Sequence, residues 1–196
     1  ALLGSAVSAR TFARNSRGMR MGPAELYRQQ LWRAWTQTPS AALEEIPANR
    51  AQLLARVSGG DSFDGGRTAS WLAAAAATIA YRAVRDARTG HTIHVATDRG
   101  AYSKELTADL RLGLRLLAWM SRGAPIVWFW WDQPWERRLP AWEDPGREHV
   151  NGGWAVPGVR EVHVYRREEA HKVLLHETVH ALGLDVPHSS VEPVRR

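Results

Sequence analysis

Three residues near the end of the chain have the types and the spacing of a metal site. His176 and His180 are four residues apart in a helical stretch, so their imidazoles project from one face and can converge on a single ion. Glu177 follows the first histidine, near enough to act on a metal-bound water without being a ligand. In this His-Glu-x-x-His pattern, Zn²⁺ polarises a carbonyl and activates a water while the glutamate takes the proton. The pattern predicts a zinc site with Glu177 as the catalytic residue.

A helix over residues 167–182 is expected to hold this site. Glu168 and Glu169 fall in its first turn, where the helix dipole favours acids, and Gly183 is expected to end it sharply and return the chain toward the metal. A separate apolar ridge should face the core: Leu175, Val179 and Leu182. The alternative interpretation is that the two histidines merely lie on the surface or core edge of an amphipathic helix.

The pattern of the remaining chain predicts helices first and strands later. The predicted helices are 23–36, 49–57, 68–87 and 103–120, and the predicted strands are 91–97, 126–131 and 161–165. Helix 103–120, with Ser103 as N-cap, has one face expected to be buried: Leu106, Leu110, Leu114, Leu117 and Met120. This order predicts an α+β fold, a mixed sheet backed by one helix with another packed on it. Residues 1–60 are expected to form a basic arm and helical appendage, and residues 61–196 the catalytic-type domain.

Composition restricts the chemistry and the partners. The 196 residues contain no cysteine, so a metal must be held by His, Asp or Glu. The formal charge is +6, and Lys104 and Lys172 are the only lysines. The arginines, four of them in residues 1–20 without an acid, favour contact with an acidic protein or a nucleic acid, although a GC-rich coding bias explains them equally well. The most apolar run, 71–80, is too short to span a bilayer.

At the histidine motif the sequence resembles the zincins, a class of zinc metallopeptidases. The metzincin pattern HExxHxxGxxH is matched at His176, Glu177, His180 and Gly183, but Val186 stands where the third histidine is expected. Asp185 is one residue earlier and His188 two residues later, and either could complete the site. Thermolysin-like enzymes take a glutamate from a following helix, for which Glu192 is a poor candidate. A ligand from another chain is a further alternative.

A closer resemblance covers residues 149–185 and is to uncharacterised zincin-like proteins of large DNA viruses. Its matching features are the segment HVNGGWAV, a strand ending in Tyr-Arg, then Arg-Glu-Glu, and then KVLLHETVHALGLD. The resemblance implies a zincin-like fold, a zinc peptidase activity and a virion or intracellular location, and it favours Asp185 over His188 as third ligand. The composition of the N-terminus also suits organelle import.

Other polar and aromatic residues are assigned structural roles by default. His91, His94, His163 and His171 are expected to be structural, and Trp128, Trp130 and Trp131 to pack in the core. Trp135, Trp142 and Trp154, with Arg137, Arg138 and Arg147, could instead bind bases or a protein. The segment 151–155 is expected either to present its backbone to a peptide substrate by β-addition or to be a plain turn.

Two functions of different class follow from these observations. The first is a zinc-dependent endopeptidase that hydrolyses peptide bonds in a peptide or protein substrate, with Glu177 as general base and then proton donor. The second is a structural or virion-assembly protein with a zincin-like fold, which docks through its basic arm and Trp-rich loops and is part of a larger assembly.

Overall fold

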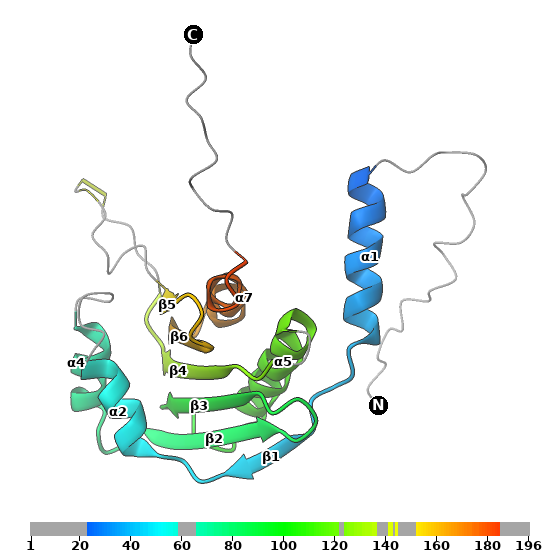
Figure 1. The fold of residues 1–196 in the computed structure, drawn as a ribbon. Coiled ribbons are helices and arrows are strands. Elements are labelled where there is room, and N and C mark those ends of the chain that lie inside the picture. The colour runs from blue at the N-terminus through cyan, green and yellow to red at the C-terminus, as the bar shows by residue number, and fades with distance from the viewer. Residues whose placement is uncertain are drawn as a thin grey trace, which may run out of the picture. The chain divides into compact units, whose positions relative to one another are not determined.

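The computed structural model describes residues 23–58, 66–121, 124–136, 141–142, 144 and 152–184. Five helices and a six-stranded mixed sheet in these residues confirm the predicted α+β class (Figure 1). The helices are α1 (Pro23–Gln37), α2 (Arg50–Ser58), α4 (Arg67–Ala74), α5 (Lys104–Ser121) and α7 (Ala170–Ala181). The strands are β1 (Leu43–Ile46), β2 (Ala80–Asp86), β3 (Thr92–Thr97), β4 (Val127–Gln133), β5 (Gly153–Ala155) and β6 (Glu161–Arg166).

The chain divides into two units, Ala1–Gln37 and Thr38–Arg196, and the whole sheet belongs to the second. Strands are ordered β1-β2-β3-β4-β6-β5. The central strands β3, β4 and β6 are mutually parallel, whereas β1, β2 and β5 pair antiparallel with their neighbours. Parallel neighbours require a long crossover, and α5 provides it between β3 and β4.

Helices cover both faces of the sheet, and the side chains of β4 point alternately to the two layers of helices. Phe129 and Trp131 belong to a cluster that includes Leu53 of α2 and Trp71 of α4. Trp128 and Trp130 point to the opposite face, where His171 of α7 contacts both rings and Gly113 of α5 lies against Trp128. All four β4 aromatic side chains are fully buried, which confirms the predicted core strand and the structural role of its tryptophans.

Helix α5 follows the sequence prediction closely. The Ser103 hydroxyl accepts a hydrogen bond from the backbone N–H of Leu106 at 3.2 Å, as an N-cap does. Met120 of the predicted face is half-buried. The four leucines of this face are fully buried: Leu106, Leu110, Leu114 and Leu117. The three- and four-residue spacing of the leucines therefore predicts which face of α5 is buried.

The predicted single helix over 68–87 is wrong. Helix α4 ends at Ala74, and Ala80–Asp86 is instead strand β2, paired between β1 and β3. The alanine-rich run favours a helix locally, but β3 needs a hydrogen-bonding partner on this side and β2 provides it. Gly90 lies with φ +74° in the turn between β2 and β3.

Residues 38–58, grouped by sequence with the N-terminal appendage, add β1 and α2 to the sheet unit. Strand β1 pairs with β2, and Leu53 and Val57 of α2 are buried in the cluster around Phe129. The short strands β1 and β5 were not predicted.

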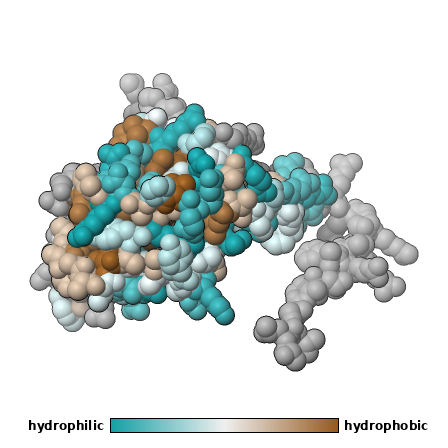
Figure 2. Space-filling view, turned by 90° about the horizontal axis from the view of Figure 1, so that it is seen from below, coloured by the Kyte–Doolittle hydropathy of each residue, from teal (hydrophilic) through white to brown (hydrophobic). Residues whose placement is uncertain are grey.

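Hydrophobic surface on the face shown in Figure 2 occurs as separate patches between hydrophilic side chains. In the part of the chain that the structure describes, no helix is both long and apolar enough to cross a bilayer.

Replacing Gly113 by alanine should destabilise the protein, although alanine is the better helix former. An added Cβ would lie 2.3 Å from Cζ3 of the fully buried Trp128. Overpacking costs about 1–3 kcal/mol, more than the gain of about 1 kcal/mol in helix propensity. Urea unfolding should show Gly113→Ala as less stable than wild type, while Arg111→Ala on the exposed face of the same helix stays within about 0.5 kcal/mol. Equal stability of the two variants would contradict this packing.

Candidate functional site

Helix α7 carries the histidine motif and has sharp limits. It begins at Ala170 with Glu169 as N-cap, three residues later than predicted, so the expectation of Glu168 and Glu169 in its first turn is wrong. At its end Gly183 has φ +64°, and its N–H bonds to the His180 carbonyl while that of Leu184 bonds to the Val179 carbonyl. These paired bonds form a Schellman motif, which confirms the predicted stop at Gly183.

The buried face of α7 differs from the predicted ridge. Leu175, Val179 and Leu182 are only half-buried. The buried residues of the helix are Ala170, Val173, Leu174, Glu177, Thr178 and Ala181. The helix packs on β5, β6 and α5 together, and this combination of neighbours selects a different face from the one that apolar side chains alone indicate.

His176 and His180 are brought together as predicted. Their Nε2 atoms are 3.1 Å apart, and the ring centroids are 4.7 Å apart at an interplanar angle of 83°. Two nitrogens bound to one tetrahedral zinc at about 2.05 Å would be about 3.3 Å apart. The side chain of His176 is 69% exposed, so the paired nitrogens are accessible from solvent. The two rings therefore already have nearly the separation of two ligands of one zinc ion.

Glu177 lies beside this pair but is far less exposed. Its Oε1 is 4.0 Å from Nε2 of His176, and its side chain is 10% exposed. A carboxylate at that distance is within one water molecule of the paired nitrogens. Glu177 could therefore exchange a proton with a water bound between its carboxylate and the histidine nitrogens.

A third metal ligand is not found among the described residues. Within them, no group of three His, Cys, Asp or Glu side chains could hold a metal ion. Asp185, His188 and Glu192 all lie outside the described residues, so the choice between Asp185 and His188 stays a prediction.

Strand β5 lies at the edge of the sheet next to α7. Asn151 is outside the described residues, but Gly153–Ala155 pairs antiparallel with β6. A Cβ on Gly153 would lie 2.3 Å from the His163 carbonyl oxygen and 2.7 Å from Val173, and one on Gly152 would lie 2.6 Å from Glu169. The two glycines therefore allow β5 to pack closely on β6 and α7.

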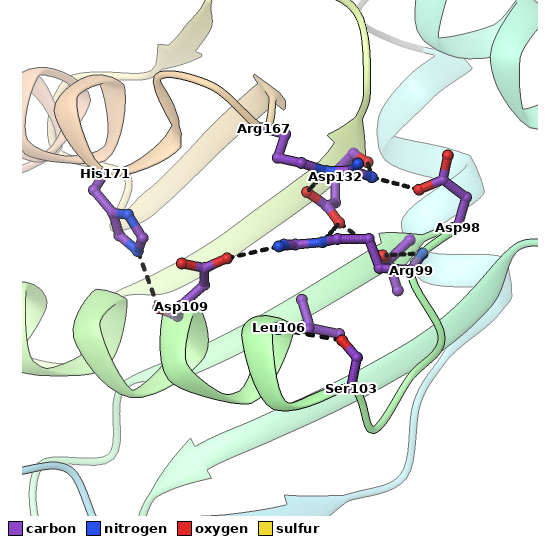
Figure 3. A network of polar contacts seen from close by, with 9 residues as sticks. Asp98, Arg99, Ser103, Leu106, Asp109, Asp132, Arg167 and His171 are labelled. Carbon is purple, nitrogen blue, oxygen red and sulfur yellow. Dashed lines mark hydrogen bonds and ion pairs between the residues drawn. The ribbon is translucent and has the colours of Figure 1, made fainter. Parts of the chain in front are cut away.

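A buried ion network fixes the approach to α7 (Figure 3). Asp132, fully buried at the end of β4, accepts hydrogen bonds from Thr97 at 2.6 Å, Arg99 at 2.7 Å and Arg167 at 3.0 Å. Arg99 also pairs with Asp109 of α5 at 2.8 Å, and Nε2 of His171 donates to the Asp109 carbonyl at 3.0 Å. The first turn of α7 is thus tied to β4 and α5.

Arg167, immediately before α7, has a second carboxylate partner in Asp98. Burial disfavours its charged form, but the hydrogen bonds and charges of Asp132 and Asp98 outweigh burial and raise the pKa of Arg167. Sequence reasoning missed this network. The available signal was that Asp98, Arg99 and Asp132 stand at the ends of two successive strands, where carboxyl ends of parallel strands meet.

Three of the remaining histidines have structural environments, as predicted. His91 is fully buried, its Nδ1 accepting from the backbone N–H of Ile126 at 3.0 Å and its Nε2 donating to Ser121 at 2.9 Å. Burial lowers the pKa of His91 and of His94, which stacks on Phe129. His171 packs against the β4 tryptophans.

His163 lies in a row of stacked rings that crosses the sheet. It stacks on Trp154 of β5 with centroids 3.8 Å apart, and on Phe129 and Trp131 of β4 at 5.2 and 5.7 Å. Neither of its ring nitrogens has a hydrogen-bond partner among the described residues. Burial, with the positive charge of Arg56, lowers the pKa of His163 to about 3. His163 is therefore a neutral core ring, and Trp154 is part of this stack.

The proposed loop and arm contacts are mostly outside the described residues. Arg137, Arg138 and Arg147 and the segment 1–22 belong there, while Trp135 and Trp142 are 39% and 97% exposed. A surface hollow of about 650 Å³ is lined by Arg67, Pro134, Trp135 and Glu136, and it includes neither histidine of the α7 pair.

Comparison of the chain with models of protein families, with curated proteins and with solved structures finds no match. What the structure itself shows is an α+β protein with a mixed six-stranded sheet and a histidine pair on α7.

Acid should destabilise the protein through His163. Well above pH 6.5 its ring is neutral in folded and unfolded chains. As the pH falls from 6.5 to about 3, the unfolded chain binds a proton that the folded protein does not, so unfolding becomes easier, by roughly 4–5 kcal/mol at pH 3. His163→Phe keeps an aromatic ring in the stack and should flatten this dependence. Urea unfolding at several pH values, with EDTA present so that metal release does not contribute, measures the effect. Identical pH profiles would contradict this role of His163.

Proposed function

We propose that the protein is a zinc-dependent metallopeptidase with its active site on α7. The observation that carries the proposal is the 3.1 Å separation of the His176 and His180 Nε2 atoms, on an exposed part of the helix and beside the Glu177 carboxylate. The contact is a hydrogen bond between an exposed and a half-buried imidazole. The same separation suits two ligands of one ion, and imidazole nitrogens are ligands that zinc prefers.

The residues present fit the roles that peptide hydrolysis requires. Zinc, when bound by His176 and His180, supplies Lewis-acid polarisation of the scissile carbonyl and activation of a water. Glu177 accepts the proton of the attacking water and then donates it to the leaving amine nitrogen. Its carboxylate, 10% exposed and 4.0 Å from His176 Nε2, is held within one water molecule of the histidine pair, as both steps require.

The position of β5 supports a peptide as the substrate. Among the described residues this strand pairs with β6 alone and packs against α7, so it is the edge strand of the sheet next to the helix. An extended peptide can add to such an edge by main-chain hydrogen bonds. The sequence resemblance to zincins, in which an edge strand beside the active-site helix binds substrate in this way, agrees with that placement.

Metal content separates the zinc site from a chance histidine pair. Purified wild-type protein should contain about one zinc per chain by mass spectrometry, and His180→Ala should lose it. His171→Gln, on the same helix but outside the pair, is the matched control and should retain zinc. Asp185→Asn and His188→Gln identify the third ligand by which of them loses the metal. Zinc-free wild-type protein, after supply of zinc during purification, would exclude the proposed site.

Cleavage of a quenched-peptide library tests the catalytic role of Glu177. Glu177→Gln keeps the shape of the side chain and should retain zinc, but cleavage should fall about a hundredfold to ten-thousandfold, because the general base is removed. Zinc binding without any cleavage by the wild type would instead favour the structural or assembly protein with a zincin-like fold.

A further inference from the structure

Lys172 supplies an exposed positive charge on helix α7, close to the histidine pair. Apart from the histidines, the side chains of this helix that are charged at neutral pH are Lys172 and Glu177. Glu177 is mostly buried, whereas Lys172 is exposed. None of the described residues forms an ion pair or a side-chain hydrogen bond with the Lys172 ammonium group. Its three N–H donors can therefore bind an anion from outside the protein.

Lys172 lies on the same face of α7 as the two histidines. It is four residues before His176 and eight before His180, and side chains at this spacing follow one another along one face of a helix. Along the helix axis, four residues separate Lys172 from His176 by about 6 Å. We call these three residues the α7 row.

The α7 row is on the side of the helix that faces β5. Val173 marks that side, because it contacts the positions where side chains on Gly152 and Gly153 would stand. Each residue of an α-helix is turned by about 100° from the one before it, so all members of the row lie within about 100° of Val173. His171 is on the other side, where it points to Asp109 of α5 (Figure 3). A peptide added to the edge of β5 would therefore pass along the row.

We propose that Lys172 binds an acidic side chain of the peptide substrate, so that the protein selects acidic peptides. The inference rests on the proposed function, because it assigns the substrate class of the same site. An extended peptide advances about 3.3 Å per residue, so the distance of about 6 Å between Lys172 and His176 along the axis corresponds to about two residues. The preferred Asp or Glu should stand two or three residues from the scissile bond, on the side nearer the start of α7.

Neighbouring arginines are already paired with acids of the protein. Arg166 forms an ion pair with Glu169 at 3.4 Å, and Arg167 pairs with Asp98 and Asp132. These guanidinium groups hold the fold together at the start of α7, so recognition of a substrate carboxylate there falls to Lys172. A lysine suits this task, since its flexible stem and three donors can follow either Asp or Glu.

Peptide binding by the zinc-loaded Glu177→Gln protein tests Lys172 separately from cleavage. Fluorescence anisotropy is measured with labelled peptide mixtures in which one position at a time is Glu, Gln or Lys. Affinity should fall in that order, and the differences should shrink as salt is raised. Adding Lys172→Gln should lower the preference for Glu over Gln about twofold to fivefold, and adding Lys172→Glu should reverse the order.

The matched control is Lys104→Glu in the same background. It alters the only other lysine of the chain, which is exposed on α5, and it changes the net charge by the same amount as Lys172→Glu. The order of affinities should stay as in the parent protein. Circular dichroism and zinc content of each variant check that the fold and the metal site are retained.

Cleavage of the same peptides by protein with Glu177 intact separates this inference from the peptidase itself. Lys172→Gln should raise KM for acidic peptides and leave kcat unchanged, because the ion pair is the same in the ground and transition states. Cleavage without a charge preference, or equal effects of Lys104→Glu and Lys172→Glu, would overturn the role of Lys172 and leave the peptidase standing. Charge-selective binding through Lys172 without cleavage would support Lys172 as a peptide-binding residue and count against the peptidase. Neither binding nor cleavage of any peptide would overturn both.

Discussion

Asp132 is fully buried at the end of β4, and a buried carboxylate costs several kcal/mol unless it is paired and hydrogen-bonded. Its partners come from the end of β3, from the loop after it and from the residue that leads into α7. Meeting this requirement therefore fixes the relative positions of the two central parallel strands and the start of the helix that carries the histidine pair. Arg99 extends the same constraint to α5 through Asp109.

Above this anchor, close packing determines where α7 lies. Val173 contacts the positions where side chains on Gly152 and Gly153 would stand, so β5 can approach the helix only because those residues are glycines. The buried face of α7 is then used by Val173, Leu174, Thr178 and Ala181. His176 lies on the outer side of the helix, where its exposed ring contacts His180 through the Nε2 atoms. Glu177, 10% exposed, lies between this outer side and the buried face. The helix thus holds one exposed and one half-buried imidazole in contact, with a mostly buried carboxylate beside them.

On the opposite face of the sheet, histidines have structural roles. His94, Phe129, His163 and Trp154 stack in a row from β3 to β5, and the imidazoles behave there as flat neutral rings. Four of the chain's eight histidines, His91, His94, His163 and His171, are held by core contacts or by hydrogen bonds to the backbone. The pair on α7 differs because its nitrogens face each other at an exposed surface.

The local sequence pattern predicted the structure correctly where a feature depends only on residues close in sequence. The leucine spacing of α5, the continuous apolar run of β4, the Gly183 stop of α7 and the i, i+4 spacing of His176 and His180 all follow from residues close in sequence, and all four appear in the structure. Tertiary structure decided the rest. Residues 80–86 follow an alanine-rich run but form a strand because β3 requires a partner. Strands β1 and β5 are too short for their sequence pattern to distinguish them from loops. The network around Asp132 joins residues up to 69 apart, and the face that α7 buries depends on three neighbouring elements at once. The sequence by itself determined which residues could form a zinc site; which side of α7 faces solvent, and hence whether those residues are accessible, was decided only by the packing around it, because burial depends on neighbours that the local pattern does not contain.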